Sequence, residues 1–429
     1  MTESSEFDEL WRVQDISESD IENEWIKWKK KLYEILDKSF GKIRISNKVK
    51  PGVDKEVKEL IAEKRKIRKE INKEENRPKK SELIRKRQDI EKKIAEKVEG
   101  NEERKLEKII NKLNDKANNN QVLWKLRRDI NSKSQCQFVV KDKEGNELRD
   151  PEKIIQRVTE YYNEIYRNNE VVNGYEEYNR ALETLIRECW KWKDTENETL
   201  SDEEVENVIK KLRMGKSAGP DKISNEMIKR SGKSFENSVI RMMKTVYENE
   251  YIPSEWHKAY IKNIYKGKGS KKDLNNYRGI ILNSHLLKMM EKIIESKEIE
   301  KLEDMSDYQC GARKGKSVRE HHFVIRNVIE EAKVKKEEIT AVYFDISKCF
   351  DKMVLKEVMK ELWLKGIRGK NWRIIYNINS ENVLIPKTEI GECMEIKVKE
   401  MIRQGSVLGA KISSLTIDSL SRMMKAREN

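Results

Sequence analysis

The sequence predicts an α+β fold that is preceded by a basic, α-helical region. Two stretches, 256–266 and 341–346, are rich in β-favouring residues and have the length of strands. Helical periodicity accompanies them, because apolar residues recur at i, i+3, i+4 and i+7 after residue 201 and again after residue 351. Between about residues 55 and 116 the same periodicity occurs in a lysine-rich stretch, which predicts amphipathic helices.

The composition favours a polyanionic partner. The chain has 429 residues, 39% of them charged, and a formal net charge of +14. Only 36% of the residues are hydrophobic, so we expect a modest core and much solvated surface. A basic chain of this kind is typical of proteins that bind nucleic acid or an acidic membrane face. Because no signal peptide or long apolar run is present, we expect an intracellular protein without a membrane partner.

Cysteine and histidine usage predicts neither a zinc site nor a disulfide framework. The five cysteines lie far apart, and no C-x-x-C pair occurs. The four histidines have no metal-ligand spacing, and the adjacent His321 and His322 would point in different directions on a helix.

Residues 1–120 form the predicted basic, mainly helical N-terminal region. Three apolar stripes, separated by breaks at 76–78 and 99–101, predict two or three amphipathic helices in a hairpin or loose bundle. Upstream of them the pattern is weak, although Trp25 and Trp28 share one helical face. For most of the lysines we expect solvated i,i+4 pairs with glutamate, and the functional alternative is a surface for RNA or DNA phosphates.

Residues 121–200 are predicted to contain a hairpin, a helix and a linker. Strand-like residues on both sides of Gly145 predict a short hairpin over 138–148. Asp150-Pro151 then predicts the start of a helix with an apolar inward side. That side consists of Ile154, Ile155, Val158, Tyr162, Ile165 and Tyr166. Residues 167–199 are polar and irregular, which is typical of a linker.

A capping box at Ser201 and Glu204 predicts the start of a further helix. The apolar residues of this helix are Val205, Val208, Ile209 and Leu212. The helix leads into G-K-S-A-G-P-D at 215–221, which has a glycine- and lysine-containing pattern. A Walker A loop would need glycine at the position of Lys210 and an apolar strand before it, so we reject that interpretation.

A pair of strands with a basic tip follows. The strand at 256–266 is followed by G-K-G-S-K-K-D, and a second strand begins near Asn275. Such a tip suits a triphosphate, with lysine as a point charge and arginine as a two-pronged donor. For any single lysine, an exposed position without a function explains the pattern better.

The stretch A-V-Y-F-D-I-S-K-C-F-D, Ala341 to Asp351, is the one around which the chain is organised. Its first six residues predict a buried strand that ends near Asp345. A carboxylate there is costly to bury unless it is paired or binds a cation. A helix containing Leu355, Val358, Met359 and Leu362 is predicted to follow and to end at Gly366. By itself, the stretch is explained equally well by an ordinary strand-to-helix turn with aspartate as the N-cap.

Five stretches, in the right order, resemble reverse transcriptases (RNA-directed DNA polymerases) of LINE-type non-LTR retrotransposons. D-I-S-K-C-F-D resembles the first catalytic motif, D-x-x-x-x-F/Y-D, of that family. The other four are L-R-M-G-K-S-A-G-P-D-K-I, the Y-K…N-Y-R strand pair, Q-C-G-A-R-K-G-K-S and R-Q-G-S-V-L. The likeness runs from about Leu200 to the C-terminus and extends weakly upstream to about residue 120. It departs at Gly279 and Ala312, where the family has proline and phenylalanine, and at Gly409-Ala410, where it has Ser-Pro.

The resemblance implies part of a right-hand polymerase within residues 201–429, with fingers at 201–340 and an incomplete palm at 341–429. It implies that Asp345 is catalytic and binds Mg²⁺, or Mn²⁺ in its place, together with the carbonyl of Ile346. The residues implied to bind dNTP are Lys266, Lys268, Arg278, Phe350, Gln404 and Gly405. Those implied to lie along the template or nucleic acid are Lys216, Arg313, Lys314 and Lys316.

The implied activity is two-metal transfer of dNTPs to a primer 3′-OH on an RNA template, in the nucleus or cytoplasm. The family supplies further carboxylates from an Asp-Asp hairpin, whereas this chain has no Asp-Asp dipeptide. We therefore expect a polymerase truncated after the R-Q-G motif and inactive alone, with its oligomeric state open. The alternatives are a non-catalytic nucleic-acid-binding protein derived from a retroelement and a helical scaffold whose charge serves only solvation.

Overall fold

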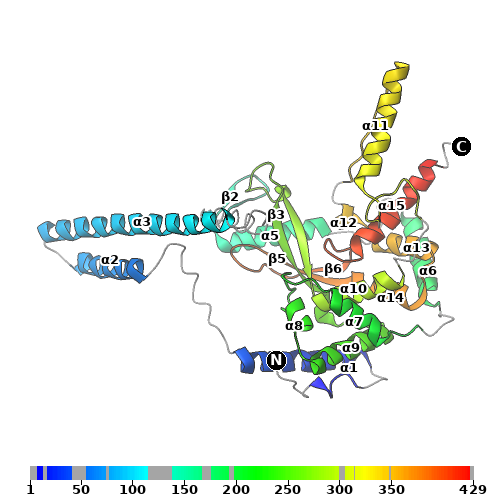
Figure 1. Ribbon diagram of the computed structural model, residues 1–429, viewed down its shortest axis with the longest axis horizontal. Helices are drawn as coiled ribbons and strands as arrows, with labels where there is room; N and C mark the ends of the chain where they lie inside the picture. Colours follow the sequence, from blue (N-terminus) through cyan, green and yellow to red (C-terminus); the bar gives the residue numbers. More distant parts are fainter. Residues whose placement is uncertain are drawn as a thin grey trace. The chain divides into compact units, whose positions relative to one another are not determined.

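The computed structural model describes ten ranges of the chain and divides it into two compact units. The described ranges are 7–12, 17–40, 55–73, 77–114, 138–166, 175–192, 198–298, 305–313, 315–346 and 349–425. The first unit comprises Met1–Ser39 with Gln137–Asn429, and the second comprises Phe40–Cys136. Figure 1 shows the elements of both units in sequence colours.

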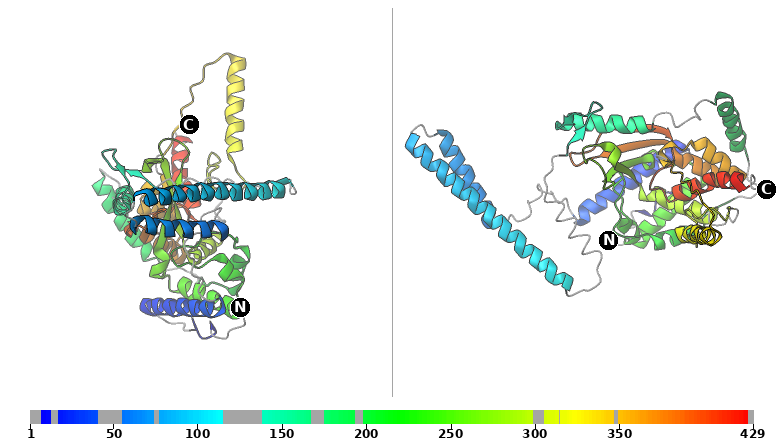
Figure 2. Two further views of the ribbon diagram at one scale, coloured as in Figure 1. Left: turned by 90° about the vertical axis from the view of Figure 1, so that its left-hand side faces the viewer. Right: turned by 90° about the horizontal axis from the view of Figure 1, so that it is seen from above.

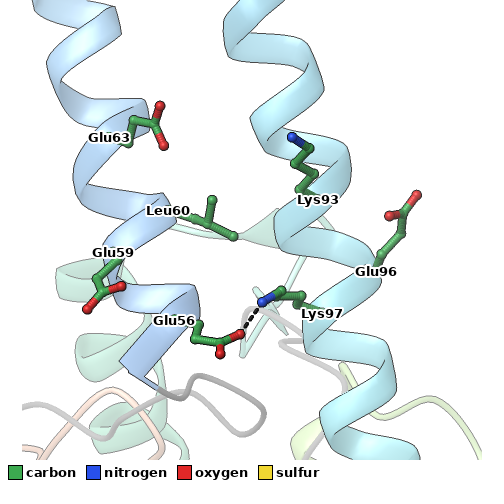
Figure 3. Close-up of a pocket in the computed structure, with 7 residues that line it drawn as sticks. All are labelled: Glu56, Glu59, Leu60, Glu63, Lys93, Glu96 and Lys97. Carbon is green, nitrogen blue, oxygen red and sulfur yellow. Dashed lines mark hydrogen bonds and ion pairs between the residues drawn. The ribbon is translucent and has the colours of Figure 1, made fainter.

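The second unit is a helical hairpin of α2 (Lys55–Lys73) and α3 (Arg77–Asn114). Figure 2 shows the two helices side by side, and Ile67, Ile71 and Ile90 are buried between them. Ion pairs flank this apolar seam, including one between Lys97 and Glu56, which Figure 3 shows. The predicted hairpin of amphipathic helices is therefore confirmed.

The predicted break at 99–101 is wrong, because α3 continues through Gly100. A single glycine inside a helix costs only about 1 kcal/mol relative to alanine, which flanking helical residues offset. At the other predicted break, 76–78, α3 begins at Arg77 with Pro78 in its first turn, and residue 76 lies outside the described residues.

The first unit is built around a four-stranded sheet with the strand order β4-β3-β5-β6. The strands are β3 (Lys258–Tyr265), β4 (Tyr277–Asn283), β5 (Ser380–Lys387) and β6 (Ile396–Glu400). β3 runs antiparallel to β4 and parallel to β5, and β6 runs antiparallel to β5. The predicted strand pair is thus confirmed, and the sheet joins strands from both sides of residue 340, where we placed the division between fingers and palm.

One face of this sheet is covered by α5 (Pro151–Tyr166), as Figure 1 shows. Ile154 and Val158 of α5 pack against Ala259, Ile261 and Leu384 of the sheet in one apolar cluster. The short hairpin of β1 (Val140–Lys141) and β2 (Glu147–Leu148) precedes α5. Both the predicted hairpin and the predicted helix are confirmed.

A larger apolar cluster lies among the helices of the first unit. Helices that contribute to it or pack against it include α7 (Asp202–Lys211), α8 (Asn225–Lys229), α9 (Lys233–Glu248), α10 (His285–Lys297), α12 (Cys349–Lys352), α13 (Leu355–Leu364), α14 (Gly369–Asn379) and α15 (Gly409–Lys425). α11 (Val318–Lys335) contributes no residue to this cluster, and short 3₁₀ turns lie at Ser254–His257 and Leu274–Asn276. The capping box at the start of α7 and the buried apolar side of α13 are as predicted. Among the described residues, no helix combines the length and apolarity that a membrane crossing requires.

The predicted linker at 167–199 is wrong, because it contains α6 (Glu176–Trp190). Leu182, Ile186 and Cys189 form a buried side at helical spacing, and the Trp190 ring packs edge-on against Trp372 with 6.0 Å between centroids. These few apolar residues are enough to bury one side of a helix whose other positions are mostly polar.

The N-terminal helix α1 (Glu18–Phe40) is part of the core of the first unit. Trp25 and Trp28 are almost completely buried and stack on each other with 5.7 Å between centroids. Their indole nitrogens donate to distant partners, Trp28 to Oγ of Ser238 at 2.9 Å and Trp25 to Oε2 of Glu255 at 3.0 Å. The weakly patterned N-terminus therefore holds elements that lie more than 200 residues later in the sequence.

We expect Trp28→Ala to lower the free energy of unfolding by about 3–5 kcal/mol, because it empties a fully enclosed space and removes the partner of Ser238. Urea unfolding followed by far-ultraviolet circular dichroism measures this. The control is Ile26→Ala on the exposed side of the same helix, for which we expect a change within about 0.5 kcal/mol. Equal losses in both variants would contradict the assignment of α1 to this core.

Candidate functional site

The loop between β3 and β4 brings three of the predicted nucleotide-binding residues to one end of the sheet. The main-chain nitrogen of Lys266 donates to the carbonyl of Asn276 at 2.8 Å, and its Nζ donates to the carbonyl of Asn275 at 2.7 Å. Lys268 is exposed at the tip, and Arg278 is exposed on β4 opposite Ile264. The tip therefore offers cations to a ligand while its backbone is fixed by hydrogen bonds.

The R-Q-G turn lies against the outer edge of β4. The carbonyl of Gln404 accepts a hydrogen bond from the main-chain nitrogen of Ile281 at 3.0 Å. Gly405 has a φ of +114°, and a Cβ at this position would lie 2.6 Å from the carbonyl oxygen of Ile281. Glycine is needed here both for the backbone conformation and for the close approach. Gln404 and Gly405 thus come to lie three residues along β4 from Arg278.

A buried arginine holds this turn in place. Arg403 is completely buried, and burial lowers the pKa of its guanidinium to about 10, so it stays charged at neutral pH. Its Nη2 donates to the carbonyl of His257 at 3.2 Å and its Nη1 to Oδ1 of Asn283 at 3.3 Å. Its Nε donates to Oδ1 of Asn382. The side chain therefore ties the turn to β4, to β5 and to the residue before β3.

A buried glutamate of α10 holds the other side of the turn. Glu291 is completely buried, and burial raises the pKa of its carboxyl. It accepts hydrogen bonds from Oγ of Ser406 at 2.6 Å and from the main-chain nitrogen of Val407 at 2.8 Å. Ser406 Oγ also accepts from the nitrogen of Gly409 at 3.0 Å. Gly409 is the first residue of α15.

Neither Arg403 nor Glu291 was identified as a site residue from the sequence. Glu291 had a recognisable signal, because it stands on the apolar side of α10 between Leu287 and Ile294. A charged side chain in such a position needs buried partners. The partners themselves lie more than 110 residues away, so the sequence does not reveal them.

The G-P-D loop after α7 packs against the junction of β4 and α10. A Cβ on Gly219 would lie 2.7 Å from the main-chain nitrogen of Ser284, so only glycine fits. Asp221 is buried, which raises the pKa of its carboxyl, and it accepts from the nitrogen of Ile223 at 3.2 Å. Lys216, predicted to contact nucleic acid, is exposed on this loop.

The predicted strand at 341–346 is wrong, because these residues are irregular and exposed. Tyr343 and Phe344 are 79% and 90% exposed. A strand needs a neighbour for its backbone groups, and no strand of the described ranges pairs with this stretch. Asp345 and Ile346 are exposed here, and the structure does not bring them to the β3–β4 tip. Phe350 lies in α12, half-buried against the helical core.

The predicted template motif is only partly described. Arg313 is half-buried, and its Nη1 donates to the carbonyl of Ser306 at 3.1 Å. Lys316 is exposed, and Lys314 lies outside the described residues. Within the described part of the chain, no group of three or more histidine, cysteine, aspartate or glutamate residues is arranged to hold a metal ion.

Asp418 lies in α15 and is a structural residue. It is completely buried and accepts from Nζ of Lys365 and Nε of Arg422, each at 2.9 Å, and from the nitrogen of Ser306 at 2.8 Å. Burial alone would raise the pKa of its carboxyl, but these three donors outweigh burial and the pKa lies below its ordinary value of 3.8. The carboxylate thus ties α15 to the end of α13 and to the template motif.

We expect Asp418→Asn to lower the free energy of unfolding by about 3–5 kcal/mol at pH 7, because it removes the buried negative charge that pairs with the nearly buried Lys365. Since the folded pKa is lowered, this stabilisation is present above pH 3.8 and is lost as the pH falls through the folded pKa. Urea unfolding at several pH values should therefore show the two proteins converging in acid. Asp307→Asn, at an exposed aspartate, is the control, and a difference that persisted in strong acid would contradict the ion pair.

Comparison with known proteins agrees with the resemblance. Residues 269–429 match the family model for reverse transcriptase (RNA-dependent DNA polymerase). The RNA-directed DNA polymerase from mobile element jockey of Drosophila melanogaster is 24% identical over 259 residues, which is 58% of this chain and 27% of that protein. The probable RNA-directed DNA polymerase from transposon BS of the same organism is 27% identical over 154 residues, 35% of this chain and 17% of that protein. The chain thus spans about a quarter or less of these relatives. Residues 269–429 are thus similar to the reverse transcriptases of non-LTR retrotransposons.

Proposed function

We propose that this chain is the template- and nucleotide-binding part of an RNA-directed DNA polymerase of a non-LTR retroelement. Its ligands are an RNA template, a DNA primer and a dNTP. The observation that carries this proposal is the alignment along β4 of Arg278, Gln404 and Gly405, with Lys266 and Lys268 at the adjoining tip. The comparisons support it through the family and through the names of the relatives.

The exposed cations at the tip suit the triphosphate. Arg278 offers a planar, two-pronged donor, and Lys268 offers a point charge on a flexible stem. The R-Q-G turn forms the neighbouring wall, since Gln404 is half-buried and its backbone is hydrogen-bonded to β4. A nucleotide held between tip and turn would contact rigid elements on both sides, which lowers the entropic cost of binding.

The family implies Mg²⁺ or Mn²⁺, and the described residues do not by themselves form the two-metal centre. Asp345 offers one carboxylate and Ile346 one carbonyl, both in an exposed stretch that pairs with no strand of the described ranges. Two ions held about 3.5–4 Å apart need several converging carboxylates, and no such group occurs among the described residues. We therefore assign to the described residues the binding of template and nucleotide.

We expect the chain to bind RNA and dNTP without extending a primer. The measurement is primer extension on an RNA template with labelled dNTP and Mn²⁺, alongside equilibrium binding of each ligand. Binding without product is the expected outcome, because the described residues bring together no group of carboxylates that could hold two metal ions. Template-dependent product that disappears in Asp345→Ala would overturn this and show that the missing carboxylates are supplied from elsewhere.

The same binding measurements distinguish the polymerase-derived function from the alternative function. A non-catalytic nucleic-acid-binding protein would bind RNA but have no specific site for dNTP. Arg278→Ala distinguishes the two, because it should abolish dNTP binding in a polymerase-derived pocket and leave most RNA binding intact. If neither RNA nor dNTP binds, and the salt dependence of RNA association is flat, the scaffold interpretation of the charge is favoured instead.

A further inference from the structure

One face of the four-stranded sheet carries an array of basic side chains. Successive residues of a strand point to opposite faces, so the pairing register decides which side chains share a face. β3 pairs Lys258 with Val383 of β5, and β5 pairs Val383 with Lys397 of β6. Further along β3, Lys262 pairs with Lys387. The basic members of this face are Lys258, Lys262, Arg278, Lys387, Lys397 and Lys399.

This basic face is opposite the face that α5 covers. Ala259, Ile261 and Leu384 alternate with the basic residues and pack against α5 in the apolar cluster. Most of the cations are exposed, including both lysines of β6 and Arg278. At the centre of the face Tyr260 is nearly buried, and Nζ of Lys387 lies 4.4 Å from the centre of its ring.

The ion pairs that the described residues place on this face are weak. Lys258 pairs with Glu395 at 2.8 Å and Lys387 with Glu392 at 3.2 Å, and all four side chains are at least 38% exposed. Exposed pairs of this kind contribute only about 0–1 kcal/mol, so a polyanion can displace them at little cost. Glu381 is the acidic residue that the β5 register places on the face itself.

A groove of about 980 Å³ lies at the β6 end of this face. Lys258, Lys397 and Lys399 line it together with the rings of Trp190 and Tyr376. The Trp190 ring is held edge-on by Tyr376 at 5.3 Å, yet 39% of the residue remains exposed. An exposed, rigidly held ring beside lysines is the arrangement that proteins use to stack an unpaired base next to its phosphate.

Four glutamates line the groove beside the three lysines, and two of the four make hydrogen bonds to neighbouring side chains. Glu250 makes a two-pronged ion pair with Arg373, at 2.5 and 2.7 Å, and Glu400 accepts from the hydroxyl of Tyr376 at 3.1 Å. Glu18 and Glu381 also line the groove. Lys258, Lys397 and Lys399 are the groove residues that also belong to the basic face, so a strand passing from the sheet into the groove meets them first.

We propose that this basic face binds the phosphate backbone of single-stranded RNA, with an unpaired base against Trp190 in the groove. From Arg278 to Lys399 the face spans about eight residues of strand, or about 26 Å, and its rows repeat at about 6.6 Å. Regularly spaced phosphates can therefore meet one row after another. The proposal rests on the proposed function and adds to it a strand-binding surface that Lys216, Arg313, Lys314 and Lys316 do not include.

The test is the salt dependence of binding of a fluorescent, unstructured 12-nucleotide RNA to the full chain. Lys397→Ala/Lys399→Ala removes two exposed cations of β6 without touching the core. Each phosphate that is no longer neutralised should lower the log–log salt slope by about 0.7, so we expect a fall of up to about 1.4 and affinity roughly tenfold weaker at about 0.1 M salt. The matched control, Lys210→Ala/Lys211→Ala, removes the same charge from the exposed end of α7 and should change little.

Cross-linking with 4-thiouridine in the same RNA locates the strand directly. We expect cross-linked peptides from β6 and from the segment containing Trp190. Equal weakening by the two double variants, or cross-links confined to α2 and α3, would overturn the assignment of this face and leave RNA binding, and so the proposed function, intact. Wild-type chain that binds neither RNA nor dNTP would overturn both.

Discussion

The guanidinium of Arg403 is buried where β4, β5 and the segment leading into β3 meet, and the candidate site depends on it. A buried charge is tolerated only when hydrogen bonds replace its water, and here two carbonyls and two asparagine side chains do so. These partners fix the position of the R-Q-G turn relative to the sheet. Removing any of them would leave an unsatisfied donor in the core.

Glu291 of α10 holds the R-Q-G turn from the side opposite Arg403. Its two hydrogen bonds hold Ser406 and Val407, and Ser406 in turn caps α15. The turn is therefore fixed by a strand edge, a buried guanidinium and a buried carboxyl group. Because Gly405 has no Cβ, the backbone of the turn can approach the carbonyl oxygen of Ile281 on β4. Rigidity at this position is what a nucleotide pocket requires.

Local periodicity was sufficient to predict the elements that bury one regular side. The capping box at Ser201, the apolar side of α13 and the strand pair around the basic tip are of this kind. The stretch 341–346 had the composition of a strand but lacks a partner strand among the described residues, and pairing is a property that a single stretch does not encode. The packing of Trp28 against Ser238 likewise depends on residues far away in the sequence.

For the candidate site, too, local patterns predicted only part of what the structure contains. Short motifs predicted Arg278, Gln404 and Gly405 as candidates, and the structure places all three along β4. Arg403 and Glu291 were missed because their partners come from other elements. The basic sheet face was missed because Lys397 and Lys258 share a face only through the register of β5 with both neighbours. Register follows from tertiary pairing, which no local pattern reveals.

The most direct test of this account is the affinity for dNTP of Glu291→Gln compared with Glu295→Gln. Both residues are buried carboxylates of α10, but Glu295 pairs with Lys292 and Lys411 and does not touch the turn. The account predicts that Glu291→Gln weakens dNTP binding roughly tenfold while the folded chain persists, since about 1.4 kcal/mol corresponds to that factor. It predicts near wild-type affinity for Glu295→Gln. Equal affinities in the two variants would contradict the claim that Glu291 positions the nucleotide-binding turn.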